Sequence, residues 1–360
     1  MKTFTLLHIG VFVFMTSIRF SNGLSCKDEL NQDVDWYVMY KLPKINGEKN
    51  NRMMINGSAY AFITSAAPGP WKLSGKSVFS DSNMMANTLR DFHMNKEELT
   101  YIMYNDDPPK GFSGSANGHL KGVVAFNDET GFWLVHSIPK FVSPSSYEYP
   151  ENALDNGQSV LCVTFKTESL NEICKQLRFD HPNIYEKALT DEIRKTLEPD
   201  ALTIFSKRPN FVRKPPLTRV TSMRSLAGKE FVSFAKDNQF LHDLYDSVIA
   251  PGLKTSLMVE TWRRGSGTIL PPSCESKFDV LDVESINMTF PQRGGIVSAA
   301  FKYTEDHSKW AISPKFWICI GDMNRMESQE RRGGGALCFI SKQIWRAYNS
   351  IISASDTCEI

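Results

Sequence analysis

Short runs of aromatic and β-branched residues, each bounded by turn-forming residues, recur along this chain and constrain its fold more than any other feature. The runs lie at 34–40, 99–104, 122–126, 132–137, 159–165, 295–301, 310–313 and 316–320. Runs of this length and composition are typical of buried β-strands. Residues 169–177 and 230–248 instead place apolar side chains at helical spacing. The sequence therefore predicts a mixed α/β fold, with strands and helices in both halves.

The tripeptide His-x-Lys occurs twice, as His119-Leu120-Lys121 and as His307-Ser308-Lys309. The first is followed by two strand-like runs with a turn between them, which predicts a hairpin with His119 and Lys121 on its first strand. Side chains two residues apart on a strand point to the same face. The second tripeptide also lies beside strand-like runs. Each would therefore present an imidazole together with an ammonium group.

Two imidazoles and two lysines can cleave a phosphodiester without a metal ion. One imidazole attacks phosphorus, the other protonates the leaving oxygen, and the lysines neutralise the non-bridging oxygens. A three-residue motif is short and the chain has 7 histidines, so a surface or packing role stays open on the tripeptides alone. His136 ends a strand-like run, where a structural or supporting role is favoured over direct catalysis.

Two basic stretches are candidates for contact with a phosphate backbone. Residues 207–229 include Arg213 and Lys214 and contain no acidic residue, which fits either a solvated loop or a loop that tracks phosphates. Arg331 and Arg332 precede three glycines, which either approach a phosphate closely or form a flexible turn. A net charge of +1 gives no general attraction to nucleic acid at neutral pH. Affinity for polyanions should be local or acid-dependent.

The N-terminus predicts a secretory signal peptide over residues 1–23. Lys2 supplies its positive end, residues 6–15 its apolar stretch, and 21–23 a small-residue cleavage site. No later segment approaches the length that spans a bilayer. We therefore expect a soluble mature protein that begins at residue 24.

The cysteines and glycosylation motifs agree with this route. Seven cysteines in a secreted chain suggest three disulfides and one unpaired thiol. Cys174, on the apolar face of the helix predicted at 169–177, is expected to be that thiol and to be buried. Asn56 and Asn287 stand in Asn-x-Ser/Thr motifs for N-glycosylation.

Longer stretches around these motifs resemble the deoxyribonuclease II family over essentially the whole mature chain. The stretches that carry the resemblance are Val34-Asp35-Trp36, Tyr40-Lys41-Leu42-Pro43, Tyr104-Asn105-Asp106, Gly118-His119-Leu120-Lys121-Gly122, 131–139, Glu305-Asp306-His307-Ser308-Lys309-Trp310, Gly321-Asp322-Met323-Asn324-Arg325 and Gly333-Gly334-Gly335-Ala336-Leu337-Cys338. The family includes a toxin branch, the plancitoxins, which these motifs do not separate from the lysosomal enzymes.

The resemblance implies a phospholipase-D-like fold, in which residues 24–168 and 169–360 form two halves of an intramolecular pseudo-dimer around one active site. It also implies acid endonuclease activity on double-stranded DNA, without sequence preference, metal or cofactor. Cleavage would pass through a phosphohistidine and leave 3′-phosphate and 5′-hydroxyl ends. The protein would be lysosomal or secreted, a monomer or a homodimer, and would have no membrane partner.

The resemblance also assigns roles to single residues. It makes His119 and His307 the catalytic pair, with Lys121 and Lys309 as their phosphate-binding partners. Apart from these assignments, we expect supporting roles for His136, Asn105 and Asn324, and DNA contacts for Arg325, Arg331, Arg332, Arg213 and Lys214. The implied disulfides are Cys26–Cys162, Cys274–Cys358 and Cys319–Cys338.

Three other functions use part of the same pattern. A ribonuclease-type pair of histidines would need the 2′-hydroxyl of RNA, and a phospholipid-cleaving enzyme would share the wider fold. A secreted toxin or DNA-binding protein would not need cleavage at all. The intact histidine and lysine in both tripeptides favour the nuclease. Which histidine attacks phosphorus stays open at this level.

Overall fold

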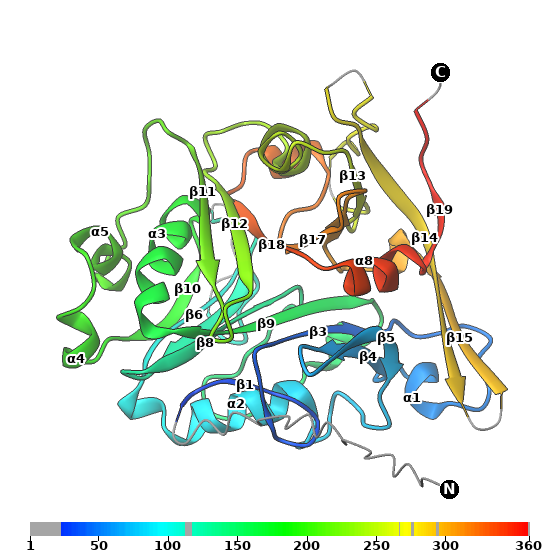
Figure 1. The fold of residues 1–360 in the computed structure, drawn as a ribbon, viewed down its shortest axis with the longest axis horizontal. Coiled ribbons are helices and arrows are strands. Elements are labelled where there is room, and N and C mark those ends of the chain that lie inside the picture. The colour runs from blue at the N-terminus through cyan, green and yellow to red at the C-terminus, as the bar shows by residue number, and fades with distance from the viewer. Residues whose placement is uncertain (1–22, 112–116, 266, 275–276, 293–294, 359–360) are drawn as a thin grey trace, which may run out of the picture.

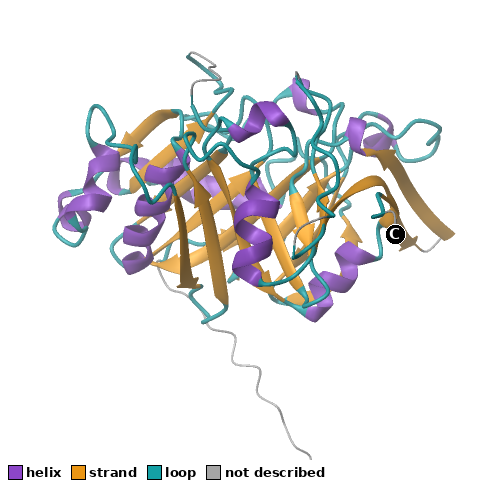
Figure 2. Ribbon diagram, turned by 90° about the horizontal axis from the view of Figure 1, so that it is seen from above, coloured by secondary structure: helices purple, strands orange, loops and turns teal. Residues whose placement is uncertain are grey.

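The computed structural model describes residues 23–111, 117–265, 267–274, 277–292 and 295–358. The predicted signal peptide therefore lies, except for Gly23, outside the described residues. Two large β-sheets form the body of the protein (Figure 1). Their strands run through the middle of the molecule, with helices and loops around them (Figure 2). No helix in the described ranges is long and apolar enough to cross a membrane.

The first sheet has eight strands within the described residues, in the order β10-β6-β7-β8-β9-β3-β4-β5. Every neighbouring pair in it is antiparallel. Its strands are β3 (Trp36–Lys41), β4 (Tyr60–Thr64), β5 (Ala67–Leu73), β6 (Thr100–Asn105), β7 (Lys121–Phe126), β8 (Thr130–His136), β9 (Gln158–Lys166) and β10 (Ile184–Ala188). A separate small sheet pairs β1 (Cys26–Lys27) with β2 (Asp33–Val34).

The second sheet has nine strands in the described chain, in the order β11-β12-β18-β17-β16-β13-β14-β15, with β19 also paired to β14. The β13–β14 pair is parallel. Its strands are β11 (Thr218–Arg224), β12 (Glu230–Lys236), β13 (Leu257–Glu260), β14 (Val280–Gln292), β15 (Gly295–Lys302), β16 (Trp310–Ile312), β17 (Trp317–Gly321), β18 (Gly334–Ile340) and β19 (Ile352–Ser355). The β14–β15 hairpin forms one end of the molecule, opposite α4 and α5 (Figure 1).

The helices are short. They are α1 (Arg52–Ile55), α2 (Met84–Met94), α3 (Leu170–Asp180), α4 (Asp191–Arg194), α5 (Pro199–Leu202), α6 (Ala250–Leu253), α7 (Glu327–Glu330) and α8 (Lys342–Asn349), with a π-helical turn η5 (Tyr245–Ile249) before α6. The 3-10 turns are η1 (Lys96–Glu98), η2 (Glu151–Ala153), η3 (Thr167–Ser169), η4 (Thr203–Phe205) and η6 (Tyr303–Glu305). α2 begins where the Asn83 side chain accepts the Ala86 N–H at 2.9 Å, which caps the helix.

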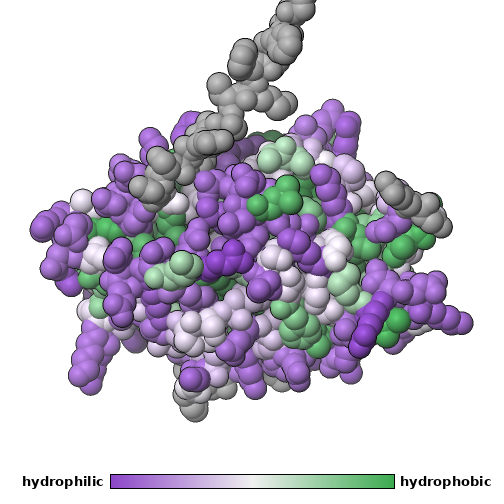
Figure 3. Space-filling model, turned by 90° about the horizontal axis from the view of Figure 1, so that it is seen from below, coloured by the Kyte–Doolittle hydropathy of each residue, from purple (hydrophilic) through white to green (hydrophobic). Residues whose placement is uncertain are grey.

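Strand alternation supplies hydrophobic cores on both faces of each sheet. In β3, Trp36 and Val38 point into the core that the two sheets share, while Tyr37 and Met39 point to the other face, under α2. A third core lies on the outer face of the second sheet, beneath η5 and α6. The outside is largely hydrophilic, with small apolar groups between (Figure 3). Burial on both faces is the reason why the predicted strands lack a clean polar face.

The two sheets share one succession of elements. In the first, β3 is followed, after α1, β4 and β5, by α2, β6, β7, β8, β9 and α3. In the second, β12 is followed by η5 and α6, then β13, β16, β17, β18 and α8, with β14 and β15 inserted after β13 and α7 before β18. The spatial order β6-β7-β8-β9-β3 matches the order β13-β16-β17-β18-β12. The predicted boundary at residue 168 stays a prediction. Beyond that residue, α3 packs against β11 and β12 of the second sheet, whereas β10 joins the first sheet.

Two details of secondary structure differ from the sequence-based prediction. His119 lies just before β7, so only Lys121 is on the strand. The helix predicted at 230–248 is wrong: residues Glu230–Lys236 form β12. Phe231 points into the shared core and Phe234 into the outer core of the second sheet. Backbone pairing with β11 and β18 on both sides decides for the strand.

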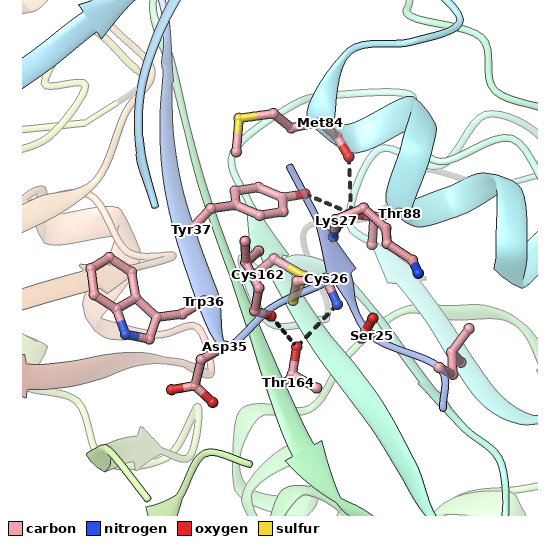
Figure 4. The surroundings of a disulfide bond; sticks show 12 residues. Ser25, Cys26, Lys27, Asp35, Trp36, Tyr37, Met84, Thr88, Cys162 and Thr164 are labelled. Atoms are coloured by element: carbon pink, nitrogen blue, oxygen red, sulfur yellow. Dashed lines mark hydrogen bonds between the residues drawn. A yellow bond between two sulfur atoms is a disulfide. The ribbon is translucent and has the colours of Figure 1, made fainter. Parts of the chain in front are cut away.

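The structure forms the disulfides Cys26–Cys162, Cys274–Cys358 and Cys319–Cys338, the pairings that the resemblance implies. Cys174 is free and buried. Figure 4 shows the first disulfide, beside which Thr164 accepts the Cys26 N–H at 3.0 Å. Thr164 also donates to the Val34 carbonyl at 2.8 Å. The Cys26–Cys162 disulfide and the Thr164 hydroxyl together fix the start of the described chain to β9.

Replacing Cys26 and Cys162 together by alanine should lower the free energy of unfolding by about 2–5 kcal/mol, because this disulfide closes a long loop. The sequence separation of the two cysteines is 136. Urea unfolding of the oxidised proteins measures the effect, with Cys174→Ala as the control for loss of a buried sulfur. Equal unfolding midpoints for the double variant and the parent would contradict the expectation.

Candidate active site

Each His-x-Lys tripeptide is held by the opposite sheet. The His119 N–H donates to the Gly333 carbonyl at 2.9 Å, and the His307 N–H donates to the Gly157 carbonyl at 2.8 Å. Gly333 directly precedes β18 and Gly157 directly precedes β9, and these strands hold equivalent places in the two sheets. The two tripeptides therefore lie at the seam between the sheets, in reciprocal positions.

Glycines make the close approach at His119 possible. A Cβ on Gly118 would lie 2.0 Å from the Asp180 carbonyl oxygen, and a Cβ on Gly333 would lie 2.3 Å from the same atom. Both are far below a van der Waals contact, so no other residue type fits without moving α3. The glycine run at 333–335 was predicted as a phosphate contact or a flexible turn. In the structure it packs against backbone.

Asp106, the residue after β6, gathers two cationic side chains beside His119. Its Oδ1 pairs with Lys121 Nζ, and its Oδ2 lies 3.8 Å from His119 Nε2 and 3.1 Å from Arg332 Nη2. Burial alone would raise the pKa of Asp106, but Lys121, His119 and Arg332 hold it well below its usual value. The Asp106 carboxylate is therefore ionised even at acid pH.

The second tripeptide has different neighbours. The His307 ring lies against Trp262, with ring centroids 4.1 Å apart. Lys309 Nζ donates to the His307 carbonyl at 2.7 Å, and the Lys309 N–H donates to Ser159 Oγ of the first sheet at 3.1 Å. Burial, together with the charge of Lys121, lowers the pKa of Lys309 to about 7.

A buried network fixes the backbone of this tripeptide. Asp306 accepts the Ser308 N–H and the Ser308 hydroxyl, both at 2.9 Å, and also the Tyr40 hydroxyl of β3. All three side chains are buried. Tyr40 therefore links the first sheet to His307 through its neighbours in sequence.

The four tripeptide side chains share one electrostatic environment. Burial lowers the pKa of both imidazoles, that of His307 to about 2. Lys309 contributes to the shift at His119, and Lys121 contributes to the shift at His307. Charges from each half thus reach the imidazole of the other. Within the described residues, His119 Nδ1 and His307 Nε2 are buried and have no hydrogen-bond partner.

Two of the three predicted supporting residues, Asn105 and His136, lie beside Lys121. Asn105 faces Lys121 across the β6–β7 pair, and its amide donates to the carbonyls of Ile138 at 3.2 Å and Phe141 at 2.6 Å. It braces the segment that follows β8. The assignment of Asn105, His136 and Asn324 as supporting residues stays a prediction.

His136 and Asn324 lie at or beyond the ends of the corresponding strands β8 and β17. His136 ends β8, the hairpin partner of β7, and Asn324 follows β17, the hairpin partner of β16. Each has a buried side-chain atom, His136 Nε2 and Asn324 Oδ1, without a partner among the described residues. Burial and Lys121 lower the pKa of His136 to about 3, which keeps this ring neutral except at strongly acid pH.

The predicted DNA contacts separate into two groups. Arg213, Lys214 and Arg331 are exposed. Arg332 is instead engaged with Asp106, and it also donates to the carbonyls of Asn117 and Gly118, both at 3.0 Å. Its contacts position the backbone that precedes His119.

Arg325 is not a DNA contact, and this prediction is wrong. Its side chain is buried and donates to Asp282 at 2.5 Å and to the Pro271 carbonyl at 3.0 Å. A guanidinium inside the protein cannot reach a phosphate backbone. The sequence could not separate a buried arginine from an exposed one, because no periodic pattern surrounds it.

Sequence reasoning missed three neighbours of the tripeptides: Asp106, Trp262 and Asp322. Asp322 follows β17 and accepts the Lys121 N–H, and burial raises its pKa to about 7. Asp106 and Asp322 stand within the stretches that carry the family resemblance, which was a usable signal. Trp262 had none, since an aromatic residue after a strand is commonplace.

No group of three or more His, Cys, Asp or Glu side chains in the described ranges is arranged to hold a metal ion. Asn56 and Asn287, the predicted glycosylation acceptors, are both exposed.

The deoxyribonuclease II family model matches residues 25–358. The chain belongs to the deoxyribonuclease II family. It is 35% identical to Deoxyribonuclease-2 of Caenorhabditis elegans, covering 97% of each chain. It is 36% identical to Plancitoxin-1 of Acanthaster planci, over 99% of this chain and 98% of that protein. Deoxyribonuclease-2-alpha of Sus scrofa is also 36% identical, over 93% of this chain and 91% of that protein. The reciprocal His-x-Lys geometry is thus found in a deoxyribonuclease II-type enzyme.

Proposed function

We propose that this deoxyribonuclease II family member is an acid endodeoxyribonuclease that acts without metal through a phosphohistidine. One histidine displaces the 5′-oxygen from phosphorus while the other protonates it, so that 3′-phosphate and 5′-hydroxyl ends remain. The observation that carries the proposal is the reciprocal placement of the two tripeptides, each with an unpartnered ring nitrogen in the described chain. Lys121 and Lys309 are suited to neutralise the phosphate oxygens.

The same observations support a phospholipase-D-like pseudo-dimer with halves 24–168 and 169–360. The matching strand order and the reciprocal hydrogen bonds from His119 and His307 fit a two-fold relation around one site. Exposed Arg213, Lys214 and Arg331 are suited to contact the phosphates of double-stranded DNA without reading its sequence. Disulfides and exposed sequons favour the secretory pathway, with a lysosomal or extracellular destination.

The electrostatics predict an acid pH optimum. Burial and the lysines lower the pKa of both imidazoles, so at neutral pH both are neutral and no general acid is present. A bound phosphate raises their pKa by its negative charge, and acid pH then protonates one of them. Further acidification protonates the nucleophile as well. Activity should therefore rise as the pH falls from neutral and decline again at lower pH.

Plasmid cleavage in excess chelator across this pH range measures the profile, with end-group analysis of the products. Quenching with alkali, in which phosphohistidine survives, would trap the intermediate on labelled DNA. Activity that disappears with chelator, or that is highest at alkaline pH, would contradict the proposal. The non-catalytic alternative would be favoured if a variant that lacks both histidines kept the full biological effect.

A further inference from the structure

The two histidines differ in the side chain that stands beside each ring. The segment that leaves β6 places the Asp106 carboxylate 3.8 Å from His119 Nε2. The segment that leaves β13, the equivalent strand in the second sheet, places the Trp262 indole on His307 at 4.1 Å between centroids. The site is therefore symmetric in its histidines and lysines and differs in the side chain beside each ring.

The charges around the two rings follow the same asymmetry. His119 faces one anion, Asp106, and three cations: Lys121, Lys309 and Arg332. The charged side chains that act on His307 are all cations: Lys309, Lys121 and Lys41. An ionised carboxylate stabilises an adjacent imidazolium, whereas burial and nearby lysines favour the neutral imidazole.

We propose that Asp106 makes His119 the general acid of the reaction and that His307 is the nucleophile. This assignment rests on the two-histidine mechanism proposed above and divides the labour within it. Asp106 is a positioning residue here: it acts through His119 and does not touch the phosphate. Trp262 is the positioning residue at His307, against whose ring it lies with the two planes tilted by 51°.

Cleavage then takes place in two chemical steps. A lone pair of neutral His307 forms the N–P bond while the P–O5′ bond breaks, and the leaving oxygen takes the proton of His119. In the second step neutral His119 takes a proton from water, whose oxygen forms a bond to phosphorus. The N–P bond breaks and its electron pair returns to His307, which leaves a 3′-phosphate and protonated His119.

Replacing the leaving 5′-oxygen by sulfur tests the assignment, because a thiolate leaves without a proton. His119→Ala should be impaired by about 10³-fold or more on ordinary DNA. On an oligonucleotide with one 5′-bridging sulfur, its single-turnover release of thiol should recover by about 100-fold or more. Phosphoenzyme should then accumulate, since the base for the second step is missing. His307→Ala should release no thiol and form no phosphoenzyme.

The outcomes separate the assignment from the mechanism beneath it. Recovery by His307→Ala and not by His119→Ala would overturn the assignment and leave the phosphohistidine in place. Recovery by neither variant, together with no phosphoenzyme in the parent protein, would overturn both.

Asp106→Asn provides a second readout. It should move the high-pH limb of the rate profile on ordinary DNA to lower pH, because His119 loses the charge that favours its protonated form. On the 5′-sulfur substrate the first step should show no such shift. Asp107→Asn, at the neighbouring carboxylate, is the matched control and should keep the parent profile. If Asp106→Asn lowers stability but leaves the pH–rate profile unchanged, Asp106 has only a structural role and the proposal that it acts through His119 is wrong.

Discussion

Replacement of either His119 or His307 by alanine should lower the rate of DNA cleavage by about 10³-fold or more while the fold remains intact. Each imidazole is half of a reaction that needs a nucleophile and an acid at once. The loss of one removes a step that water at the same position cannot supply. Because both act in the same transition state, the double variant should be about as inactive as each single variant.

Single-turnover cleavage of plasmid DNA at acid pH measures this, alongside thermal unfolding of each variant. His242→Ala is the matched control, since His242 is exposed and its ring contacts Phe240 outside the site. The control should keep the parent rate. A His119 or His307 variant that cleaves within about ten-fold of the parent would remove that residue from the catalytic pair.

Arg325→Met should lower the free energy of unfolding by about 3–5 kcal/mol, because it leaves the buried Asp282 carboxylate with only a 3.8 Å contact to Arg263. Arg325 Nη1 lies 2.5 Å from Asp282, and its Nε lies 3.5 Å from Asp243. Even with Arg325 in place, burial raises the pKa of Asp282 to about 6. Removal of the Arg325 guanidinium would raise the free-energy cost of ionised Asp282 further.

Urea unfolding measures the loss. Arg331→Met, at an exposed arginine, is the control and should change stability by less than about 0.5 kcal/mol. The second substitution in Arg325→Met/Asp282→Asn should recover part of the loss, since it removes the orphaned charge. If Arg325→Met kept its stability but weakened DNA binding with a smaller salt dependence, the original DNA-contact prediction would be restored.

The sequence predicted the strands well because the signal is local. Residues 34–40 and 159–165 combine β-branched and aromatic residues with turns at their ends, and both contain strands in the structure. The helix predicted at 230–248 shows the limit of this reasoning. Its phenylalanines fit a helical period as well as a strand that is buried on both faces, and only the partner strands β11 and β18 decide between them.

The candidate site was predictable in its reactive groups. His119, Lys121, His307 and Lys309 were found because a short motif was repeated and lay beside predicted strands. Arg332 was also noticed, but its role was not, since a DNA contact and an ion pair with Asp106 require the same residue type. Burial of Arg325 was likewise outside the reach of the sequence.

The sequence by itself therefore determined most of the strands, the cysteine count and the set of imidazoles and lysines, all of which depend on residue type and short spacing. Only the tertiary structure decided that the tripeptides meet at one seam, and that Asp106 stands beside His119 while Trp262 stands beside His307. The reason is physical: the effect of a charge on a neighbouring group depends on the distance and burial that the folded chain imposes. A separation counted along the sequence contains neither quantity.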